Sequence, residues 1–369
     1  MNNRNKKTKI ALIGPYPPPY GGISIHIQRL KERLEEKKYE CLVYNLGGQK
    51  KSQKKNVIRV KKIKKWLLRY FFFSKEHIIH YHNPDWRLRI IFGLMSFLGK
   101  KVIISIHGES LQDSLKRGSW FKKQLIQIAL KHTSLIIVLN PKTEKLILSL
   151  GIKPKHIKII PSFIPPIVKR EEIAEIPHEV WGFVDNHSPV ILANASKIVF
   201  YNNQDLYGLD MYIDLCTNLK QYYPNIGFIF CLPDIGDYEY FNKMKQRIKE
   251  KNIENNFLFQ TKPCQMYPIL MKSDVFVRPT NTDGYGISIA EAIYFNVPSV
   301  ASNVCPRPEG TILFKNRDIS NFTSKTKDVL CNYKKYKKRL ETIKLENNSE
   351  KIIEIYKKLI NKKTRYAKN

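Results

Sequence analysis

The chain has 369 residues, which is enough for two domains that each bury a hydrophobic core. Its formal net charge is +32, and its six cysteines include no C-x-x-C pair, which argues against a disulfide framework and against a cysteine zinc site. The apolar run 10–14 is too short for a secretory signal, and the apolar stretches 66–73 and 90–99 are too short to cross a bilayer. We therefore expect a protein of a reducing compartment with neither a signal peptide nor a transmembrane segment.

The positive charge is concentrated at the two ends of the chain. Residues 1–170 contain 36 lysines and arginines against 9 acids, whereas residues 171–330 contain 15 against 19. Residues 331–369 again have a basic excess, with 13 lysines and arginines against 4 acids. Because the middle of the chain is close to neutral, the charge indicates a partner of one region rather than a property of the whole surface.

The most basic segment of the first half also has a helical apolar pattern. Ten basic residues and no acid lie between Lys50 and Arg69. Apolar side chains recur there at spacings of three or four, at Ile63, Leu67, Tyr70 and Phe71. A basic amphipathic helix is typical of a membrane-surface element. The residues predicted to face an anionic membrane are Lys61, Lys62, Lys64, Lys65 and Trp66. The alternative is a solvated helix whose apolar stripe packs on its own domain.

Strand and helix patterns alternate through the first half of the chain, which predicts a parallel sheet of the doubly wound type. The strand candidates are 9–14, 40–46, 77–82, 101–107, 134–140 and 156–162. Four prolines between 161 and 177 then interrupt the alternation, as expected of a linker. We assign residues 1–168 to an N-terminal Rossmann-like domain and residues 169–188 to the linker.

A second series of strand candidates follows the linker, at 189–195, 225–233, 256–261, 274–280 and 297–302. It predicts a second Rossmann-like domain over residues 189–330. The basic segment 331–369 has a helical pattern, and we expect it to return to the N-terminal domain. The predicted fold class is thus α/β, with two facing doubly wound domains and a cleft between them, where ligands bind at the carboxyl ends of the strands.

Two glycines after the first strand are candidates for phosphate binding. Gly21 and Gly22 precede a helix, so the backbone could approach a phosphate and the helix N-terminus could favour its charge. The alternative is ordinary turn chemistry. The segment does not contain G-x-G-x-x-G, which argues against a nicotinamide dehydrogenase.

Several histidines lie at or near predicted strand ends. His107 ends the fourth predicted strand, where a side chain reaches the ligand-binding edge, so we predict a functional role over a structural one. His77, His80 and His82 lie in the third predicted strand, but no acid stands beside them. We therefore expect no metal site there.

Two carboxylates eight residues apart, Asp283 and Glu291, flank a DGYG turn and the start of a helix. Backbone amides at that helix N-terminus could hold a diphosphate. Glu291 would share their face and accept from a ribose diol, and Asp283 would point toward the transferred group. The predicted donor-binding residues of this segment are Gly284, Tyr285, Gly286, Ile287, Ser288 and Glu291. The alternative is that Asp283 caps the helix and backbone groups satisfy Glu291.

Taken together, these motifs resemble those of the retaining glycosyltransferases of family 4, which have the GT-B fold. The similarity runs from GPYPPPYGG through SIHG and VLN to YGLD, EAIYFNVPSVAS and RPEGTILF. The resemblance implies catalytic roles for His107 and Asp283 and a donor loop at Gly21 and Gly22. The family's acid pair is Glu-x7-Glu, so Asp283 is one methylene shorter than the family pattern, while Glu291 matches it.

The family places an arginine and a lysine on the donor diphosphate, after the first strand of the second domain. Lys197 matches the first of these bases, and Tyr207 replaces the second. Arg278, in FVRPT, is a candidate to supply the missing charge. No D-x-D motif is present, so helix N-termini and Lys197 would neutralise the leaving group, and we expect no metal or other cofactor.

The resemblance implies a hexosyltransferase that moves a sugar from a nucleotide-diphosphate donor with retention of configuration. The basic N-terminal domain adds the expectation of a lipid-linked saccharide acceptor at an anionic membrane, in surface polysaccharide or capsule biosynthesis. The expected location is the cytoplasm, peripheral to the inner face of the cell membrane. Two alternatives remain open: a sugar-nucleotide epimerase of the same fold, and a basic nucleic-acid-binding protein, although no recognisable nucleic-acid-binding motif is present.

Overall fold

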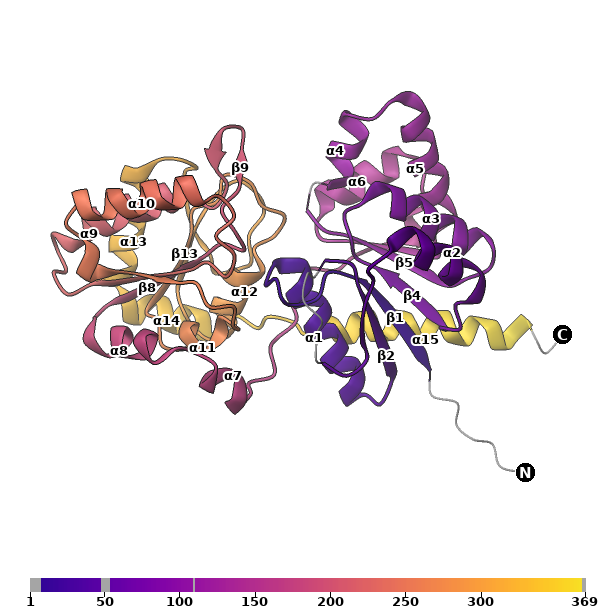
Figure 1. Cartoon of the computed structure of the whole chain (residues 1–369), viewed down its shortest axis with the longest axis horizontal. Helices are drawn as coiled ribbons and strands as arrows, with labels where there is room; N and C mark the ends of the chain where they lie inside the picture. Colours follow the sequence, from indigo (N-terminus) through magenta and orange to yellow (C-terminus); the bar gives the residue numbers. More distant parts are fainter. Residues whose placement is uncertain (1–7, 48–53, 109, 367–369) are drawn as a thin grey trace. The chain divides into compact units, whose positions relative to one another are not determined.

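The computed structural model describes residues 8–47, 54–108 and 110–366. Within this part, the chain divides into two compact units. Unit 1 comprises the residues up to 164 together with those from 347 onward, and unit 2 comprises residues 165–346. Each unit is a parallel β-sheet with helices on both faces (Figure 1), which confirms the predicted α/β class with doubly wound sheets.

Unit 1 contains a seven-stranded sheet in the order β3-β2-β1-β4-β5-β6-β7, in which every pairing is parallel. Its strands are β1 (Lys9–Gly14), β2 (Glu40–Asn45), β3 (Val57–Arg59), β4 (Ile78–Tyr81), β5 (Val102–Ile106), β6 (Leu135–Val138) and β7 (Ile157–Ile159). Its helices are α1 (Gly22–Glu36), α2 (Ile63–Phe73), α3 (Trp86–Phe97), α4 (Ser110–Lys116), α5 (Trp120–His132), α6 (Pro141–Ser149) and α15 (Asn348–Tyr366).

Side chains that alternate between the two faces of the sheet form two hydrophobic cores in unit 1. In β1, Ile10 and Leu12 face α1 and α15, while Ala11 and Ile13 face the core shared with α2, α3 and α5. Both faces of this sheet are therefore apolar, as expected of a parallel sheet covered on both sides. Tyr356 of α15 is completely buried in the first of these cores, which explains why the C-terminal helix belongs to unit 1.

Unit 2 contains a six-stranded sheet in the order β12-β11-β8-β13-β14-β15 and a small antiparallel pair, β9 and β10. Its strands are β8 (Val190–Asn194), β9 (Phe200–Tyr201), β10 (Gln204–Asp205), β11 (Gly227–Cys231), β12 (Phe257–Gln260), β13 (Val275–Arg278), β14 (Ser299–Ser302) and β15 (Ile312–Phe314). Its helices are α7 (Arg170–Ala174), α8 (His178–Asn186), α9 (Leu209–Lys220), α10 (Tyr238–Glu250), α11 (Tyr267–Leu270), α12 (Ile287–Tyr294), α13 (Ile319–Cys331) and α14 (Tyr333–Glu341).

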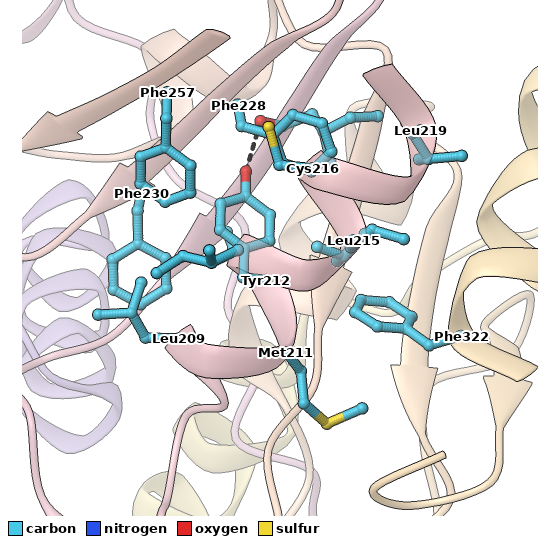
Figure 2. Close-up of a cluster of buried hydrophobic side chains, with 14 of the residues drawn as sticks. Leu209, Met211, Tyr212, Leu215, Cys216, Leu219, Phe228, Phe230, Phe257 and Phe322 are labelled. Atoms are coloured by element: carbon cyan, nitrogen blue, oxygen red, sulfur yellow. Dashed lines mark hydrogen bonds between the residues drawn. The ribbon is translucent and has the colours of Figure 1, made fainter. Parts of the chain in front are cut away.

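Helix α9 anchors one core of unit 2. Figure 2 shows Tyr212 of this helix among Phe228, Phe230 and Phe257 of the neighbouring strands. The Tyr212 hydroxyl lies 2.7 Å from the carbonyl oxygen of Ile191 and 3.0 Å from that of Ile229. The fully buried phenol therefore has hydrogen-bond partners, so its ring adds apolar contact area without an unsatisfied polar atom.

The strand order reverses once in each main sheet. In unit 1 the chain continues outward from β1 through β2, then returns to place β4 on the other side of β1. In unit 2 the chain continues from β8 through β11 to β12, then returns to place β13 on the other side of β8. In doubly wound sheets, ligands bind beside such a reversal, at the carboxyl ends of the strands. Each unit therefore has one edge where functional side chains are expected.

Three parts of the structure differ from the sequence-based expectations. The short edge strands β3 and β15 and the pair β9 and β10 were not predicted. Segment 169–188, predicted as a linker, contains α7 and α8, and Ile176 and Val180 are buried in a core of unit 2. The basic segment 331–369 is divided, because α14 belongs to unit 2 and α15 to unit 1.

In helix α2, the apolar side chains that face outward are not the ones that the sequence predicted. Leu67 and Tyr70 are buried against the sheet of unit 1, so the predicted apolar stripe is in part a packing face. Trp66 is half-buried and stacks on Tyr70, with ring centroids 4.9 Å apart. Leu68, Phe72 and Phe73 are exposed instead, each by 65% or more. Residues 50–53 of the basic segment lie outside the described residues.

Candidate functional site

Three neighbouring strands of unit 2 end in polar side chains at the same edge of the sheet. Asn194 ends β8, Arg278 ends β13 and Ser302 ends β14, and these strands are adjacent in the order β8-β13-β14. The edge lies at the reversal of strand order, where a ligand is expected. Local sequence patterns place each residue at a strand end, and the parallel pairing brings the three together.

Arg278 connects the strand ends to the DGYG turn. Its Nε donates to Oδ2 of Asp283 at 2.7 Å. Its Nη1 lies 3.2 Å from Oδ1 of Asn194 and 3.2 Å from Oγ of Ser288. The guanidinium also lies 5.5 Å from the ring centroid of Tyr207, a cation–π distance. Arg278 is therefore held in place by four side chains from separate segments.

Arg307 binds Asp283 as well, and sequence reasoning did not predict its role. Its side chain is 1% exposed, and its Nη1 donates to Oδ2 of Asp283 at 2.8 Å. Its other nitrogens donate to the carbonyl oxygen of Ser302 at 3.0 Å and to the hydroxyl of Thr280 at 3.0 Å. One carboxylate thus lies between two guanidiniums, which leaves this group of side chains with a net positive charge.

The electrostatics keep Asp283 ionised. Burial alone would raise the pKa of its carboxyl, but the charges of Arg278 and Arg307 and their hydrogen bonds outweigh burial. The pKa of Asp283 therefore falls well below its usual range. The remaining oxygen, Oδ1, accepts from the backbone N–H of Gly284 at 2.8 Å. At neutral pH, Asp283 is a fixed anion and not a proton donor.

The start of α12 follows the predicted pattern. Its N-cap is Gly286, with φ at 90°, a left-handed conformation that favours glycine. A Cβ at this position would lie 2.7 Å from Cδ1 of Ile289 and 3.1 Å from Nη1 of Arg307. Ser288 and Glu291 are both buried in the helix, Glu291 with 4% exposure. Burial raises the pKa of Tyr285, in the turn before the helix, to about 12.

The two positions that correspond to the family's diphosphate-binding bases, Lys197 and Tyr207, differ in their surroundings. Lys197 is exposed in the loop after β8. Tyr207, which stands at the position of the family's second base, has its hydroxyl 2.9 Å from Oγ of Ser196 and its ring beside Arg278. Arg278 of β13 and Tyr207 thus lie side by side, while a role of Arg278 toward the diphosphate remains a prediction.

In unit 1, Gly21 and Gly22 lie at the start of α1, with Gly21 as its N-cap. The N–H of Gly21 donates to Oγ of Ser24 at 2.8 Å, and that hydroxyl lies 2.7 Å from the carbonyl oxygen of Pro19. The helix start is therefore fixed by local hydrogen bonds. The sequence predicted this position correctly, while the binding role of the two glycines remains a prediction.

His107 lies within a group of histidines at the carboxyl edge of the unit 1 sheet. Its Nε2 is 3.2 Å from Nδ1 of His82, which follows β4. His26 of α1 lies close to both, and its Nδ1 is 2.7 Å from the carbonyl oxygen of Ser162. Below them, His80 bonds Tyr356 of α15 and Ser105 of β5. His77 stands apart, since its Nδ1 accepts from the N–H of Lys9.

Burial keeps these imidazoles neutral. It lowers the pKa of His26 to about 4, against the opposing effect of the hydrogen bond to Ser162. The pKa values of His82 and His107 are also well below 6.5, first because of burial and then because of neighbouring cationic or imidazole groups. At neutral pH each ring therefore carries one proton and one lone pair.

Comparison with known proteins covers both units. A model of Glycosyltransferase Family 4 matches residues 20–166, and a model of Glycosyl transferases group 1 matches residues 185–344. The chain belongs to the glycosyltransferases of family 4. This confirms the family resemblance of the sequence motifs, and the fold is the GT-B fold of that family.

Two curated relatives of this family 4 member come from bacteria. The chain is 24% identical over 276 residues to the UDP-Gal:alpha-D-GlcNAc-diphosphoundecaprenol alpha-1,3-galactosyltransferase of Escherichia coli, covering 68% of the chain and 64% of the relative. It is 29% identical over 173 residues to Protein CapJ of Staphylococcus aureus, covering 42% of the chain and 43% of that protein. The chain thus spans less than two thirds of the length of either relative.

Among solved structures, Anabaena Alr3699/HepE in complex with UDP-glucose has the same fold as this family 4 member. The TM-score is 0.67 at 14% identity, and the match covers 96% of this chain and 99% of that chain. At this identity the likeness concerns the fold alone. It does not test the roles of the predicted site residues, which remain predictions.

Arg307, His26 and His82 were not among the predicted site residues. Arg307 lies 24 positions after Asp283 in the sequence, and the segment RPEG indicates only the family motif. His26 sits inside a helix, where its position gave no local signal. His82 was considered for a metal site together with His77 and His80, whereas the structure groups it with His26 and His107. The adjacency of β1, β4 and β5 could have indicated this group.

Proposed function

We propose that this protein transfers a hexose from a nucleotide-diphosphate donor to a lipid-linked saccharide, with retention of configuration, in surface polysaccharide biosynthesis. The observation that carries the proposal is the group formed by Arg278, Asp283 and Arg307 at the start of α12. Its net positive charge lies at the sheet edge where doubly wound domains bind their ligands. The name of the Escherichia coli relative, which specifies a UDP-Gal donor and a diphosphoundecaprenol acceptor, supports the donor and acceptor classes.

Unit 2 is proposed to bind the donor. Nη2 of Arg278 makes no hydrogen bond within the described part of the chain, so it is available to a diphosphate oxygen. The N-terminus of α12 adds backbone N–H groups and a positive helix dipole, and exposed Lys197 adds a further charge. These groups would stabilise the leaving diphosphate through fixed charges, without a metal on the phosphates.

Asp283 is proposed to act as a fixed anion. Because two guanidiniums and one N–H bind its carboxylate, it cannot exchange a proton at neutral pH. Its function would be to orient Arg278 and Arg307 and to accept a hydrogen bond from a donor-sugar hydroxyl. This differs from general acid–base catalysis, which requires a pKa near the working pH.

Unit 1 is proposed to bind the acceptor, with His107 as the catalytic residue of that unit. Nε2 of this imidazole faces His82, so its other ring nitrogen, Nδ1, is the one suited to orient an acceptor hydroxyl. Retention follows from the family resemblance, in which the acceptor attacks from the face that the phosphate leaves. Glu291 would bind the donor ribose, as the acid of other dinucleotide folds does.

Helix α2 is proposed to contact an anionic membrane. Lys61, Lys62, Lys64 and Lys65 are all exposed at its start, and Leu68, Phe72 and Phe73 form an exposed apolar surface on its later turns. A pocket of about 800 Å³ beside the helix is lined by aromatic rings, including Trp66, by the cationic Arg69 and Lys75 and by the acidic Glu76. The proposed contact is peripheral. Among the described residues, no helix is long and apolar enough to span a bilayer.

The function is tested by incubating the protein with a panel of nucleotide sugars and bacterial membrane lipid extract. We expect one nucleotide sugar to release its nucleoside diphosphate when extract is present, with the sugar recovered in the lipid fraction. Isomerisation of a donor without any acceptor would indicate the epimerase instead. Tight, salt-dependent binding of nucleic acid with no response to nucleotide sugars would contradict both the transferase and the epimerase hypothesis.

Replacing Glu291 by alanine is expected to weaken donor binding, because a ribose diol loses a charged hydrogen-bond partner worth about 1.5–3 kcal/mol. That range corresponds to roughly a 10- to 150-fold rise in the dissociation constant of the nucleoside diphosphate, measured by calorimetry. Glu239→Ala, at an exposed acid of α10, is the matched control and should bind as the parent does. Unchanged affinity in folded Glu291→Ala would remove Glu291 from the donor site.

Changing Lys61, Lys62, Lys64 and Lys65 together to glutamine is expected to release the protein from anionic vesicles at low salt. Each lysine near an anionic leaflet contributes about 1 kcal/mol and is screened by salt. Donor binding by unit 2 should be unaffected. A control variant changes four exposed lysines of unit 2 to glutamine, at Lys243, Lys245, Lys249 and Lys251. If both variants sediment with vesicles like the parent, α2 has no membrane role.

A further inference from the structure

Three imidazoles from three separate segments of unit 1 converge on one point. His26 comes from α1, His82 from the end of β4 and His107 from the end of β5. One ring nitrogen from each lies within 4.8 Å of those of the other two. The ring centroids form a nearly equilateral triangle, with separations of 5.3, 5.3 and 5.5 Å. Three imidazoles in this arrangement could be ligands of one metal ion.

The ring-centroid separations and the distance between His82 and His107 agree with tetrahedral coordination. With metal–nitrogen bonds of about 2.0–2.1 Å, the rings of three histidines would have centroids about 5.2 Å apart and ligand nitrogens about 3.4 Å apart. The observed separation of Nδ1 of His82 from Nε2 of His107 is 3.2 Å. The three ligand nitrogens lie within 4.8 Å of one another, so an ion would bind after side-chain rotations that shorten the longer separations.

The hydrogen bonds leave a lone pair unused at this point. The carbonyl oxygen of Ser162 can only accept, so Nδ1 of His26 carries the proton and Nε2 carries the lone pair. That Nε2 is buried and has no hydrogen-bond partner. Carbonyl acceptors on the second ring nitrogen are characteristic of metal-binding histidines, because they fix the tautomer and the ring orientation.

We propose that His26, His82 and His107 form a binding site for a divalent transition metal, with Zn²⁺ as the natural ion. Imidazole ligands favour zinc, copper and nickel, whereas magnesium, calcium and manganese favour oxygen ligands, of which this group has none. Three protein ligands leave a fourth position for an exogenous oxygen. This proposal departs from the expectation of no metal, but it concerns unit 1 and leaves the donor diphosphate in unit 2 without one.

Neighbouring charges specify the fourth ligand. Arg29 acts on His26 and Arg89 on His107 as nearby cations. Arg89 is 1% exposed, and its Nε and Nη1 have no hydrogen-bond partners within the described residues. A metal ion here would add positive charge to a region without a carboxylate among its ligands. The fourth ligand is therefore expected to be anionic, either hydroxide or an oxygen of a phosphate or carboxylate.

The test measures metal binding by the full-length protein without a polyhistidine tag and without donor or acceptor, so it is independent of the proposed transferase activity. After treatment with a chelator, the protein is titrated with Co²⁺ and separately with Zn²⁺, and the bound metal is counted by elemental analysis. We expect one equivalent of either ion and a visible Co²⁺ spectrum of tetrahedral type. His26→Gln and His82→Gln should each weaken binding by at least about tenfold.

Two controls separate this site from adventitious binding. His77→Gln, at an exposed histidine outside the group, and Cys331→Ser, at an exposed thiol, should bind Co²⁺ as the parent does. Excess Mg²⁺ should not displace the ion. The proposal is overturned if the parent takes up no stoichiometric metal, or if folded His26→Gln keeps the parent's affinity. The parent measurement decides the question even where a histidine variant fails to fold.

Discussion

Replacing Arg278 by methionine is expected to abolish transfer and to weaken nucleoside diphosphate binding by roughly 10- to 150-fold. The estimate assumes that the lost guanidinium makes one charged hydrogen bond to the diphosphate, worth about 1.5–3 kcal/mol. Methionine keeps much of the side-chain length, so the contact with the ring of Tyr207 is partly preserved. Binding is measured by calorimetry and transfer by release of nucleoside diphosphate.

Arg247→Met provides the matched control for this variant. Arg247 is another arginine of unit 2, paired with Asp214 at 2.6 Å on the surface of α9 and α10. The Arg247→Met variant should bind the donor and catalyse transfer like the parent. If folded Arg278→Met keeps the parent's donor affinity, Arg278 serves only to hold Asp283, and the base missing at Tyr207 must be supplied elsewhere.

The sequence predicted the two sheets because their strands have strong local signals. Residues 9–14 and 190–194 are short apolar runs bounded by turn residues, as buried parallel strands require. Strands β3 and β15 each have three residues at the edge of a sheet and include partly or largely exposed side chains. Edge strands of this length carry neither a continuous apolar run nor a clear alternation, so no local pattern distinguishes them from loops.

The site was predictable where one segment contains its parts, and not where tertiary structure assembles them. The turn at Asp283 and the start of α12 are adjacent in sequence, and both were placed correctly. Arg307 reaches Asp283 from beyond β14, and its position depends on hydrogen bonds to Ser302 and Thr280. A prediction of that contact would have required the strand order and the path of the loop after β14.

Helix α2 shows how one amphipathic pattern can serve two surfaces. The spacing of Leu67 and Tyr70 indicated an apolar face, and the structure buries that face in unit 1. Leu68, Phe72 and Phe73 lie on the other side and are exposed. Periodicity gives the angle between side chains but not which face meets the sheet. The proposed membrane contact therefore depends on these three side chains together with the neighbouring lysines.

Replacing Asp283 by asparagine is expected to destabilise unit 2 at neutral pH by about 3–5 kcal/mol, because it leaves two largely buried guanidiniums without their anion. Such a loss corresponds to a fall on the order of 10 °C in the unfolding temperature, measured by calorimetry. Asp214→Asn, which removes the partner of Arg247 at a more exposed site, should cost no more than about 1 kcal/mol. Equal stabilities of parent and Asp283→Asn would mean that the two ion pairs contribute no net stability.

The pH dependence of the difference in stability between the parent and Asp283→Asn identifies the cause of that difference. The folded-state pKa of Asp283 lies below the unfolded value of about 3.9, so the carboxylate stabilises the folded protein fully at pH values above the unfolded pKa. As the pH falls below about 4 toward the folded pKa, the unfolded state takes up the proton first and this stability is lost. Asp283→Asn has no such group. The gap between the two proteins should therefore be constant from neutral pH to about pH 5 and should narrow in stronger acid, whereas a gap caused by altered packing would persist unchanged.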